Sequence, residues 1–379
     1  MHNKTILIAA GGTGGHLYPA LAVAEEIRRE EPETKIIFVG TRDRIESKEV
    51  PREGFPFVPI TIHAPRKSLV SFITFPWKFA LAILACMKLV AKEKPLAFLG
   101  AGAYLSVPAG IAAWAFHVPI ALLEINSVPG SSNKFLALLA NKLFLAYREA
   151  AATFPKRLSG TVTVCGTPVR WMGDRSAARG AANSLKEEAR LSFGLEASRT
   201  TILAFGGSLG AGPINQALRI SARSFAEQGY NVLWQTGRSA NVTEFQQEFS
   251  DIANVRVMEY IYDMEGAYRA ADLVICRAGA SSLAELARLG KPAVLVPWSG
   301  AMANHQERNA RAFEQDGSAV VLTDREVANK LPETVIGLLN DSERLHAMAE
   351  AMKQRDNPDA ARQVAQWLIT TSSAGNSRK

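Results

Sequence analysis

Two glycine-rich segments carry the residue types that bind a phosphate group. The first, Gly11-Gly12-Thr13-Gly14-Gly15-His16, follows an apolar run and precedes a helical pattern over residues 17–30. The second, Gly206-Gly207-Ser208-Leu209-Gly210, follows another apolar run and precedes a helical pattern that reaches residue 228. Glycine lets the backbone adopt positive φ and approach a ligand closely, and a helix N-terminus offers unpaired N–H groups to an anion. Two such loops predict two Rossmann-like halves that face each other across a cleft.

A third segment of the same kind begins at Arg277. It reads Arg277-Ala278-Gly279-Ala280-Ser281-Ser282-Leu283-Ala284-Glu285, follows a predicted strand and opens a helix with two hydroxyl groups at its start. The carboxylate of Glu285 could accept hydrogen bonds from two adjacent hydroxyl groups of a ligand. The alternative is a solvated glutamate in the first helical turn.

The elements that must position these segments alternate between strand and helix, which is typical of doubly wound parallel sheets. The sequence therefore predicts an α/β fold of two Rossmann-like domains, with Gly290 and Gly317 at helix C-termini. We expect an N-terminal domain over residues 1–165 and a C-terminal domain over residues 166–357, with the connection at Cys165–Arg170. A helix at about 358–370 is expected to pack back on the first domain, and residues 371–379 are expected to be disordered. The predicted strands are 5–10, 35–40, 96–100, 120–123, 142–146, 161–164, 201–205, 232–235, 255–258, 272–276 and 293–296.

Composition narrows the class of protein. The chain has 379 residues, 47% of them hydrophobic, which suits two or three domains with sizeable cores. Its three cysteines, Cys86, Cys165 and Cys276, lack metal-ligand spacing and favour a reduced cytoplasmic setting. Met1-His2-Asn3-Lys4 leads straight into a predicted strand, so we expect no signal peptide. The net charge of +7 is moderate and no nucleic-acid-binding motif accompanies it, so a nucleic-acid partner is disfavoured.

The segment from Arg66 to Lys94 combines cations with apolar and aromatic side chains. Its longest uncharged run without proline, residues 79–87, is far shorter than the roughly 20 residues that span a bilayer. The segment is typical of one that lies on an anionic membrane surface. The alternative is a core helix whose lysine side chains reach out to solvent, and both descriptions can hold for different faces. The predicted membrane patch consists of Arg66, Lys67, Phe72, Phe75, Trp77, Lys78, Phe79 and Lys88.

Four motifs in order along the chain resemble one family. They are Gly11–His16 with Pro19-Ala20, Gly166-Thr167-Pro168-Val169-Arg170, Gly206–Ala211, and Asn304-His305-Gln306 with Asn309-Ala310. Together they resemble the MurG family of glycosyltransferases, which has the GT-B fold, and the resemblance covers essentially the whole chain. It implies inverting transfer of GlcNAc from UDP-GlcNAc to the MurNAc 4-hydroxyl of lipid I, forming lipid II. It also implies a peripheral protein on the cytoplasmic face of the inner membrane, with other enzymes of cell-wall synthesis as partners.

The resemblance also implies which residues bind the donor. The loop of Ser208 and the segment that ends at Glu285 are expected at the diphosphate and the ribose, and Gln306 at the GlcNAc hydroxyl groups. No Asp-x-Asp pair ends a predicted strand, so we expect helix N-termini and backbone N–H groups, rather than a metal cofactor, to stabilise the leaving diphosphate. The full donor set is Thr13, Gly14, Gly15, Asn126, Arg170, Ser208, Ile261, Ala280, Ser281, Ser282, Leu283, Ala284, Glu285 and Gln306.

On the acceptor side, the attacking hydroxyl group must lose a proton, and a base with a pKa near neutral favours that step. Among the six histidines, His16 has the best context because it ends the first glycine loop. Its other possible roles are contact with the acceptor diphosphate and orientation of the loop. The candidates for the acceptor diphosphate are Gly12, Thr13, Gly14, Gly102 and Tyr104.

The chain departs from the family pattern at three places. Leu123 and Ile125 replace the histidine and glutamine of a His-Glu-Gln-Asn motif, whose asparagine corresponds to Asn126. The segment Gly100–Tyr104 lacks one glycine, and Ser281–Ala284 replaces a run of the Thr-Val-Ser type. Alternative functions are a GT-B glycosyltransferase acting on diacylglycerol and a UDP-GlcNAc 2-epimerase. A dinucleotide-dependent oxidoreductase fits less well, because neither loop reads Gly-x-Gly-x-x-Gly.

Overall fold

The protein consists of two compact units. The structure, a computed structural model, describes residues 4–12, 14–62, 69–170, 179–301 and 304–376. Unit 1 comprises Met1–Trp171 together with Asn357–Lys379, and unit 2 comprises Met172–Asp356. The chain thus leaves unit 1, forms unit 2 and returns. The structure keeps residues 166–171 in unit 1, whereas the sequence analysis assigned them to the second domain.

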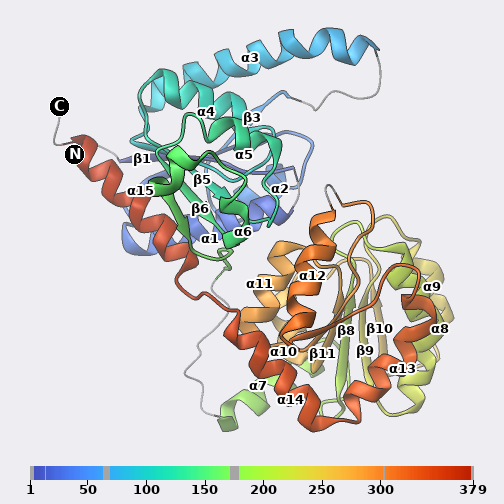
Figure 1. The fold of residues 1–379 in the computed structure, drawn as a ribbon. Helices are drawn as coiled ribbons and strands as arrows, with labels where there is room; N and C mark the ends of the chain where they lie inside the picture. Colours follow the sequence, from blue (N-terminus) through green and yellow to red (C-terminus); the bar gives the residue numbers. More distant parts are fainter. Residues whose placement is uncertain (1–3, 13, 63–68, 171–178, 302–303, 377–379) are drawn as a thin grey trace. The chain divides into compact units, whose positions relative to one another are not determined.

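Unit 1 is built on a seven-stranded parallel sheet with the order β3-β2-β1-β4-β5-β6-β7. The strands are β1 (Thr5–Ala9), β2 (Lys35–Thr41), β3 (Phe57–Ile60), β4 (Ala97–Gly100), β5 (Ile120–Glu124), β6 (Lys142–Leu145) and β7 (Val162–Val164). The helices are α1 (Gly14–Glu30), α2 (Glu46–Arg52), α3 (Leu69–Glu93), α4 (Ser106–Ala115), α5 (Ser131–Leu136), α6 (Arg148–Ala151), a 3₁₀ helix (Lys156–Thr161) and the C-terminal α15 (Ala360–Asn376) (Figure 1).

The register of the central strands brings the glycine segments of unit 1 to one edge. Ala9 at the end of β1 pairs with Val39 of β2 and with Gly100 of β4. Carboxyl ends of neighbouring parallel strands therefore meet, which is where ligands bind in open α/β sheets. The loop after β4 is tied to β1 directly, because the Ala101 N–H and the Ser106 hydroxyl both donate to the Ala9 carbonyl, at 2.9 and 3.1 Å.

Helix α3 has one buried face. Ala82, Cys86 and Val90 recur every fourth residue and lie in the core, where α3 packs against α4. Trp77 and Leu84 point outward and are 72% and 53% exposed. No helix in the described parts of the chain combines the length and apolar character needed to cross a membrane.

The chain ends in α15, which packs against α1 and β4 of unit 1. The ring of Trp367 meets that of Phe144 edge-on, with centroids 6.4 Å apart. The helix continues to Asn376. The structure thus continues the helix into the expected tail, and the disorder of residues 371–379 stays a prediction.

Unit 2 is built on a six-stranded parallel sheet with the order β10-β9-β8-β11-β12-β13. Its strands are β8 (Thr201–Phe205), β9 (Asn231–Gln235), β10 (Val255–Met258), β11 (Leu273–Cys276), β12 (Ala293–Leu295) and β13 (Ala319–Val321). Its helices are α7 (Arg179–Ser192), α8 (Gly212–Glu227), α9 (Val242–Glu248), α10 (Met264–Ala270), α11 (Ala280–Leu289), α12 (His305–Gln315), α13 (Val327–Leu339) and α14 (Ser342–Gln354).

Each face of this sheet has its own core. Ile202 and Ala204 of β8 pack in one cluster with residues of α8 and α13, and Leu203 and Phe205 pack in the other with residues of α10 and α11. This alternation follows from the period of two along a strand, and a strand buried on both faces reads as a continuous apolar run. Phe205 pairs with Gln235 and with Cys276, so β8, β9 and β11 end together.

The sequence did not predict β3 and β13. Both lie at edges of their sheets. Pro59 interrupts β3, and proline is tolerated in sheets chiefly on edge strands, because it lacks a backbone N–H. Strand β13 has only three residues, too few for an alternating pattern to stand out. The sequence patterns for these two strands were therefore weak, because one contains proline and the other is short.

Candidate active site

The first glycine loop of unit 1 lies beside the loop after β4. Gly12 has φ +85° and Gly102 has φ +102°, conformations that favour glycine. A Cβ atom on Gly102 would stand 2.8 Å from Nδ1 of His16, so the imidazole packs closely against this glycine. The structure therefore places His16 against Gly102 and Gly12 near Ala103, and the roles of these residues at the acceptor stay predictions.

Two of the acceptor candidates contact protein groups. The Gly12 N–H donates to Oε2 of Glu46 at 3.0 Å, so this amide is engaged within the protein, and the contact of Gly12 with the acceptor diphosphate stays a prediction. The Tyr104 hydroxyl donates to the Ile62 carbonyl at 3.2 Å. Its oxygen keeps acceptor capacity, and its role stays a prediction.

Glu124, at the end of β5, organises the segment that carries Asn126. Its side chain is buried, and Oε1 accepts from the backbone N–H and the side-chain amide of Asn126 at 2.9 and 3.0 Å. Oε2 accepts from the Gly130 N–H and the Asn133 amide, both at 3.0 Å. Leu123 and Ile125, the two residues that depart from the family motif, are buried. Apolar side chains at these two positions therefore fill the core.

Arg170 lies in unit 1 and pairs with two carboxylates there. Its Nε donates to Glu25 at 2.9 Å, and its terminal nitrogens donate to Glu53 at 3.0 and 2.6 Å. Burial lowers the pKa of Arg170, but hydrogen bonds and charge attraction from Glu25 and Glu53 outweigh it, so the pKa is raised overall. Its contact with the nucleotide stays a prediction.

In unit 2, Gln235 joins the second glycine loop to the loop after β10. Its buried side-chain amide donates to the Gly207 carbonyl at 3.0 Å and accepts from the Ile261 N–H at 2.8 Å. The Ile261 N–H, expected near the nucleotide, is therefore engaged inside the protein. Sequence reasoning did not single out Gln235, because a glutamine at the end of a strand carries no motif.

Close backbone approach explains the other glycines of this loop. A Cβ atom on Gly210 would overlap the Thr236 carbonyl. That carbonyl also accepts from the side-chain amide of Asn215 at 2.9 Å, and the Arg238 N–H donates to the Ser208 carbonyl at 3.1 Å. The loop of Ser208 is thus a rigid turn in front of α8, as anion binding requires.

The third segment forms the start of α11, with Gly279 as its N-cap and no side-chain cap. Leu283 and Ala280 are buried, whereas Ser281, Ser282 and Ala284 are half-buried. A ligand can therefore meet the first turn through backbone N–H groups and the two hydroxyl groups. The buried Leu283 contributes no side-chain contact.

Glu285 is half-buried on α11 and accepts a hydrogen bond from the Tyr268 hydroxyl at 2.7 Å. Burial raises the pKa of Glu285 to about 7, although the Tyr268 hydrogen bond acts in the opposite direction. Burial and the neighbouring charge of Glu285 also raise the pKa of Tyr268. Perturbed carboxylates of this kind occur often at functional sites. Tyr268 lies 17 residues away along the chain and carries no motif, so it was not predicted from the sequence.

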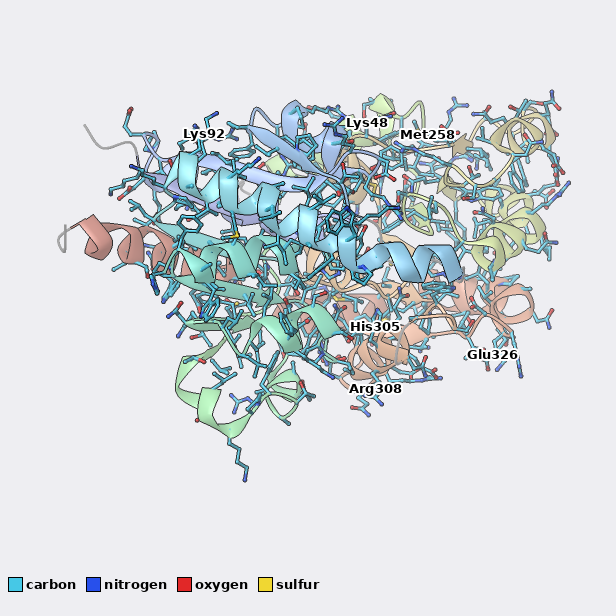
Figure 2. The ribbon with its side chains drawn as sticks, turned by 90° about the horizontal axis from the view of Figure 1, so that it is seen from above. Lys48, Lys92, Met258, His305, Arg308 and Glu326 are labelled. Atoms are coloured by element: carbon cyan, nitrogen blue, oxygen red, sulfur yellow. The ribbon has the colours of Figure 1, made fainter. Side chains whose placement is uncertain are left out.

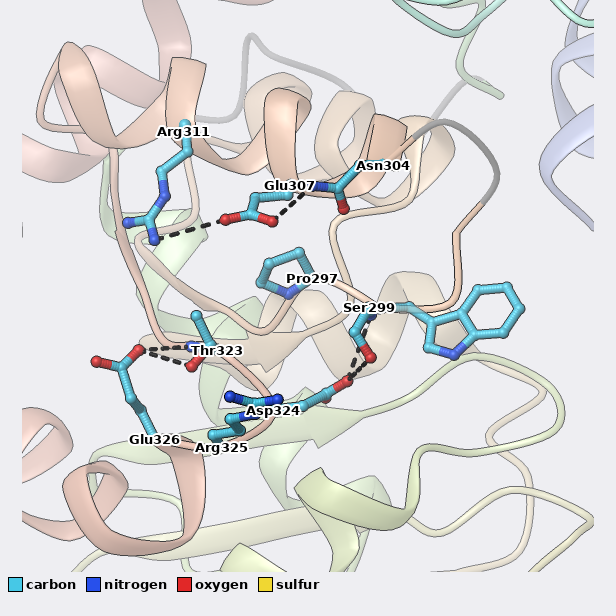
Figure 3. A pocket seen from close by; sticks show the side chains of 10 residues that line it. Pro297, Ser299, Asn304, Glu307, Arg311, Thr323, Asp324, Arg325 and Glu326 are labelled. Carbon is cyan, nitrogen blue, oxygen red and sulfur yellow. Dashed lines mark hydrogen bonds and ion pairs between the residues drawn. The ribbon is translucent and has the colours of Figure 1, made fainter.

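Gln306 lies at the start of α12 beside a pocket of about 620 Å³. Its Oε1 accepts from the backbone N–H of Trp298 at 3.0 Å, and Trp298 lines the pocket. Inside, Glu307 points toward Asn304 and Arg311, and Ser299 lies against Asp324 (Figure 3). The pocket is lined by Pro297, Trp298, Ser299, Asn304, Glu307, Arg311, Thr323, Asp324, Arg325 and Glu326.

Several predicted site residues lie outside the described residues: Thr13, Arg66 and Lys67. Phe72 belongs to α3, but its side chain is not described. Among the described residues, no cluster of three or more His, Cys, Asp or Glu side chains is arranged to hold a metal ion. The expected lack of a metal cofactor stays a prediction.

Known proteins resemble this chain along nearly its whole length. Residues 6–145 match the glycosyltransferase family 28 N-terminal domain, and residues 201–364 match the family 28 C-terminal domain. A relative from Salinibacter ruber is 37% identical over 366 residues, which cover 96% of each chain. A relative from Chlorobium luteolum is 38% identical, covering 96% of this chain and 98% of the relative. Both are named UDP-N-acetylglucosamine--N-acetylmuramyl-(pentapeptide) pyrophosphoryl-undecaprenol N-acetylglucosamine transferase.

A solved structure agrees with these relatives. The crystal structure of MurG from Acinetobacter baumannii matches with a TM-score of 0.71 and 27% identity, covering 97% of this chain and 99% of that one. This chain belongs to the MurG family. The N-terminal family 28 match covers β1–β6 of unit 1, and the C-terminal match covers the sheet of unit 2 and continues into α15 of unit 1. The predicted fold class, two parallel-sheet α/β domains of the GT-B type, is confirmed.

Proposed function

We propose that this protein transfers GlcNAc from UDP-GlcNAc to the 4-hydroxyl of the MurNAc-pentapeptide on pyrophosphoryl-undecaprenol, forming lipid II and UDP. The observation that carries the proposal is the identity of 37% to a transferase of this name over 96% of both chains. Solved UDP-N-acetylglucosamine 2-epimerases match at 14–15% identity, which supports a shared fold and not a shared activity. The reaction inverts the anomeric carbon, because the acceptor oxygen attacks opposite the leaving diphosphate.

Unit 2 binds the donor in this proposal. The diphosphate lies between the turn of Ser208 and the first turn of α11, where backbone N–H groups stabilise the charge that develops on UDP as it leaves. Glu285 accepts hydrogen bonds from the ribose hydroxyl groups. Gln306 is held by Trp298 through its oxygen, and its amide nitrogen donates to the GlcNAc hydroxyl groups.

His16 is the proposed base. It takes the proton from the MurNAc 4-hydroxyl while that oxygen bonds to the anomeric carbon, and the bond from that carbon to the diphosphate oxygen breaks with its electron pair leaving on UDP. Packing against Gly102 limits the positions that the imidazole can adopt. The first turn of α1 supplies amides to the acceptor diphosphate. We expect no metal ion to be needed, because helix N-termini provide the positive potential.

Unit 1 carries the proposed membrane patch. Large apolar side chains are exposed on α3, α4 and α5, which pack in sequence against one another. Cations accompany them: Lys78, Lys88 and Lys92 are exposed, and Lys92 lies near the end of α3 (Figure 2). Phe79, expected in the patch, instead packs partly against the core. The exposed apolar residues are Trp77, Leu81, Leu84, Trp114, Phe116, Phe135 and Leu138.

This patch would hold the enzyme on an anionic surface at the cytoplasmic face of the plasma membrane, where an undecaprenyl-linked acceptor is anchored. Exposed aromatic side chains enter the interface, and the lysines are attracted to anionic headgroups. At that surface we expect other enzymes of cell-wall synthesis as partners, with roles in cell shape and cell division.

The proposal is tested by measuring UDP release with UDP-GlcNAc and competing acceptors. We expect release with a lipid I analogue, and release at background rate with diacylglycerol alone. Excess EDTA should leave the rate unchanged. UDP release with diacylglycerol but not with the lipid I analogue would support the alternative acceptor, and conversion of UDP-GlcNAc to UDP-ManNAc would support the epimerase.

A further inference from the structure

Glu46 is a buried carboxylate that the chemistry described above does not use. Its side chain is 0% exposed, at the start of α2. Oε1 accepts from the backbone N–H of Thr41 at 3.0 Å and from the Thr41 hydroxyl at 2.7 Å, and Oε2 accepts from the Gly12 N–H at 3.0 Å. The carboxylate therefore connects the end of β2 to the glycine loop that follows β1.

Two glycines leave the space that this side chain occupies. A Cβ atom on Gly40 would lie 2.5 Å from Cγ of Glu46, and one on Gly11 would overlap the carboxyl group itself. Gly11 lies just after β1, and Gly40 lies near the end of the neighbouring strand β2. Glycine at both positions therefore leaves room for the glutamate side chain between the strands, in addition to allowing the backbone its conformation.

The carboxylate acts on the conformation of Gly12. Gly12 has φ +85°, and its N–H is held by a charge-assisted hydrogen bond, which is stronger than a neutral one. Helix α1 begins two residues later at Gly14, with His16 in its first turn against Gly102. A change in the orientation of the Gly12 peptide therefore changes the direction in which α1 begins.

We propose that Glu46 is a positioning residue for the transfer reaction. It fixes the Gly12 peptide, and through it the place of His16 and of the first turn of α1 beside the acceptor. It also occupies the Gly12 amide, so an acceptor diphosphate is bound by N–H groups of α1 instead. Glu46 itself touches no substrate, and this inference rests on the proposed function.

The test compares Glu46→Gln with the matched control Glu49→Gln on the same helix. Glutamine has the same shape, but its NH₂ group must point at either the Gly12 N–H or the Thr41 N–H, and both of these backbone groups can only donate. A displacement of about 1 Å at a reacting group costs roughly a hundredfold in rate. We expect kcat per folded molecule to fall at least tenfold in Glu46→Gln, with the KM for UDP-GlcNAc changed less than twofold and Glu49→Gln unchanged.

If Glu46 has a purely structural role, Glu46→Gln lowers thermal stability but keeps kcat per folded molecule. The activity of that variant then recovers when a heated sample is cooled. A second measurement needs no substrate. Amide hydrogen exchange in the peptide covering residues 10–21 should speed up in Glu46→Gln, and exchange in unit 2 should not change. Unchanged exchange together with unchanged kcat would overturn the proposal. A wild-type protein that releases no UDP contradicts the proposed function instead, and the exchange result still decides whether Glu46 holds the loop.

Discussion

Donor binding should depend on pH through Glu285. Burial raises the pKa of this carboxyl group to about 7, so it is mostly ionised at pH 8 and mostly protonated at pH 6. A protonated carboxyl loses acceptor capacity toward the ribose hydroxyl groups. If only the ionised form binds, the competent fraction falls roughly tenfold from pH 8 to pH 6, and the Kd for UDP-GlcNAc rises by the same factor.

Isothermal titration calorimetry with UDP-GlcNAc measures this without the chemical step. The sugar nucleotide is preferable to UDP, whose terminal phosphate titrates near neutral pH. Glu285→Gln should bind about ten- to a hundredfold more weakly at pH 8, because a hydrogen bond to a charged group is worth about 1.5–3 kcal/mol.

The pH dependence decides the assignment more sharply than the loss of affinity. Glu285→Gln has no ionisable group at this position, so its Kd should be flat between pH 6 and 8. Tyr268→Phe removes the hydrogen bond that lowers the pKa of Glu285, so the wild-type dependence should move to higher pH. A wild-type Kd that is constant from pH 6 to 8, or a Glu285→Gln variant that keeps the pH dependence, would show that ionised Glu285 does not bind the ribose.

Four further results are expected. The pKa of Glu285 is raised from 4.5 to about 7, so its contribution to stability is present below pH 4.5 and is lost as pH rises through 7. The free energy of unfolding of Glu285→Gln should therefore exceed that of the wild type by up to about 3 kcal/mol at pH 8 and differ little at pH 4. Urea denaturation at the two pH values measures the difference. His16→Ala should lower kcat by ~10²-fold with the Kd for UDP-GlcNAc unchanged; a raised acceptor KM with normal kcat would make His16 a binding residue. The double variant Lys78→Glu with Lys88→Glu should bind anionic vesicles about thirtyfold or more weakly in cosedimentation, at about 1 kcal/mol per cation. The control variant Arg344→Glu with Lys353→Glu on α14 should bind like the wild type. Vesicle binding that changes neither with these substitutions nor with salt would show that another surface docks on the membrane. Gln235→Leu should cost about 1–3 kcal/mol of stability through the unpaired Ile261 N–H and raise the Kd for UDP-GlcNAc; a normal donor Kd would separate this glutamine from the site.

The sequence predicted the elements whose signals are local. Both glycine loops were recognisable because a strand, a turn and a helix start lie within a few residues of each other. Ligand-facing roles for Ser208 and Glu285 followed from the same segments together with the family resemblance. The edge strands β3 and β13 were missed because proline and short length weaken the pattern.

The residues that hold the loops could not be predicted in this way. Glu46 acts on Gly12, 34 residues away, and Gln235 acts on Gly207, 28 residues away. Their partners are backbone groups, which leave no mark in the amino-acid sequence. The ion pairs of Arg170 could not be predicted either, because its carboxylate partners lie 145 and 117 residues away along the chain.

The proposed reaction moves GlcNAc from UDP to the MurNAc 4-hydroxyl of an undecaprenyl-linked acceptor. The most direct test is to isolate the product formed from UDP-GlcNAc and a lipid I analogue and to determine its mass and linkage by mass spectrometry and NMR. We predict an acceptor that has gained one N-acetylhexosamine, joined to MurNAc O4 with the anomeric configuration inverted to β. An unmodified acceptor alongside UDP-ManNAc, or a sugar attached with the α configuration of the donor, would contradict the proposed transfer.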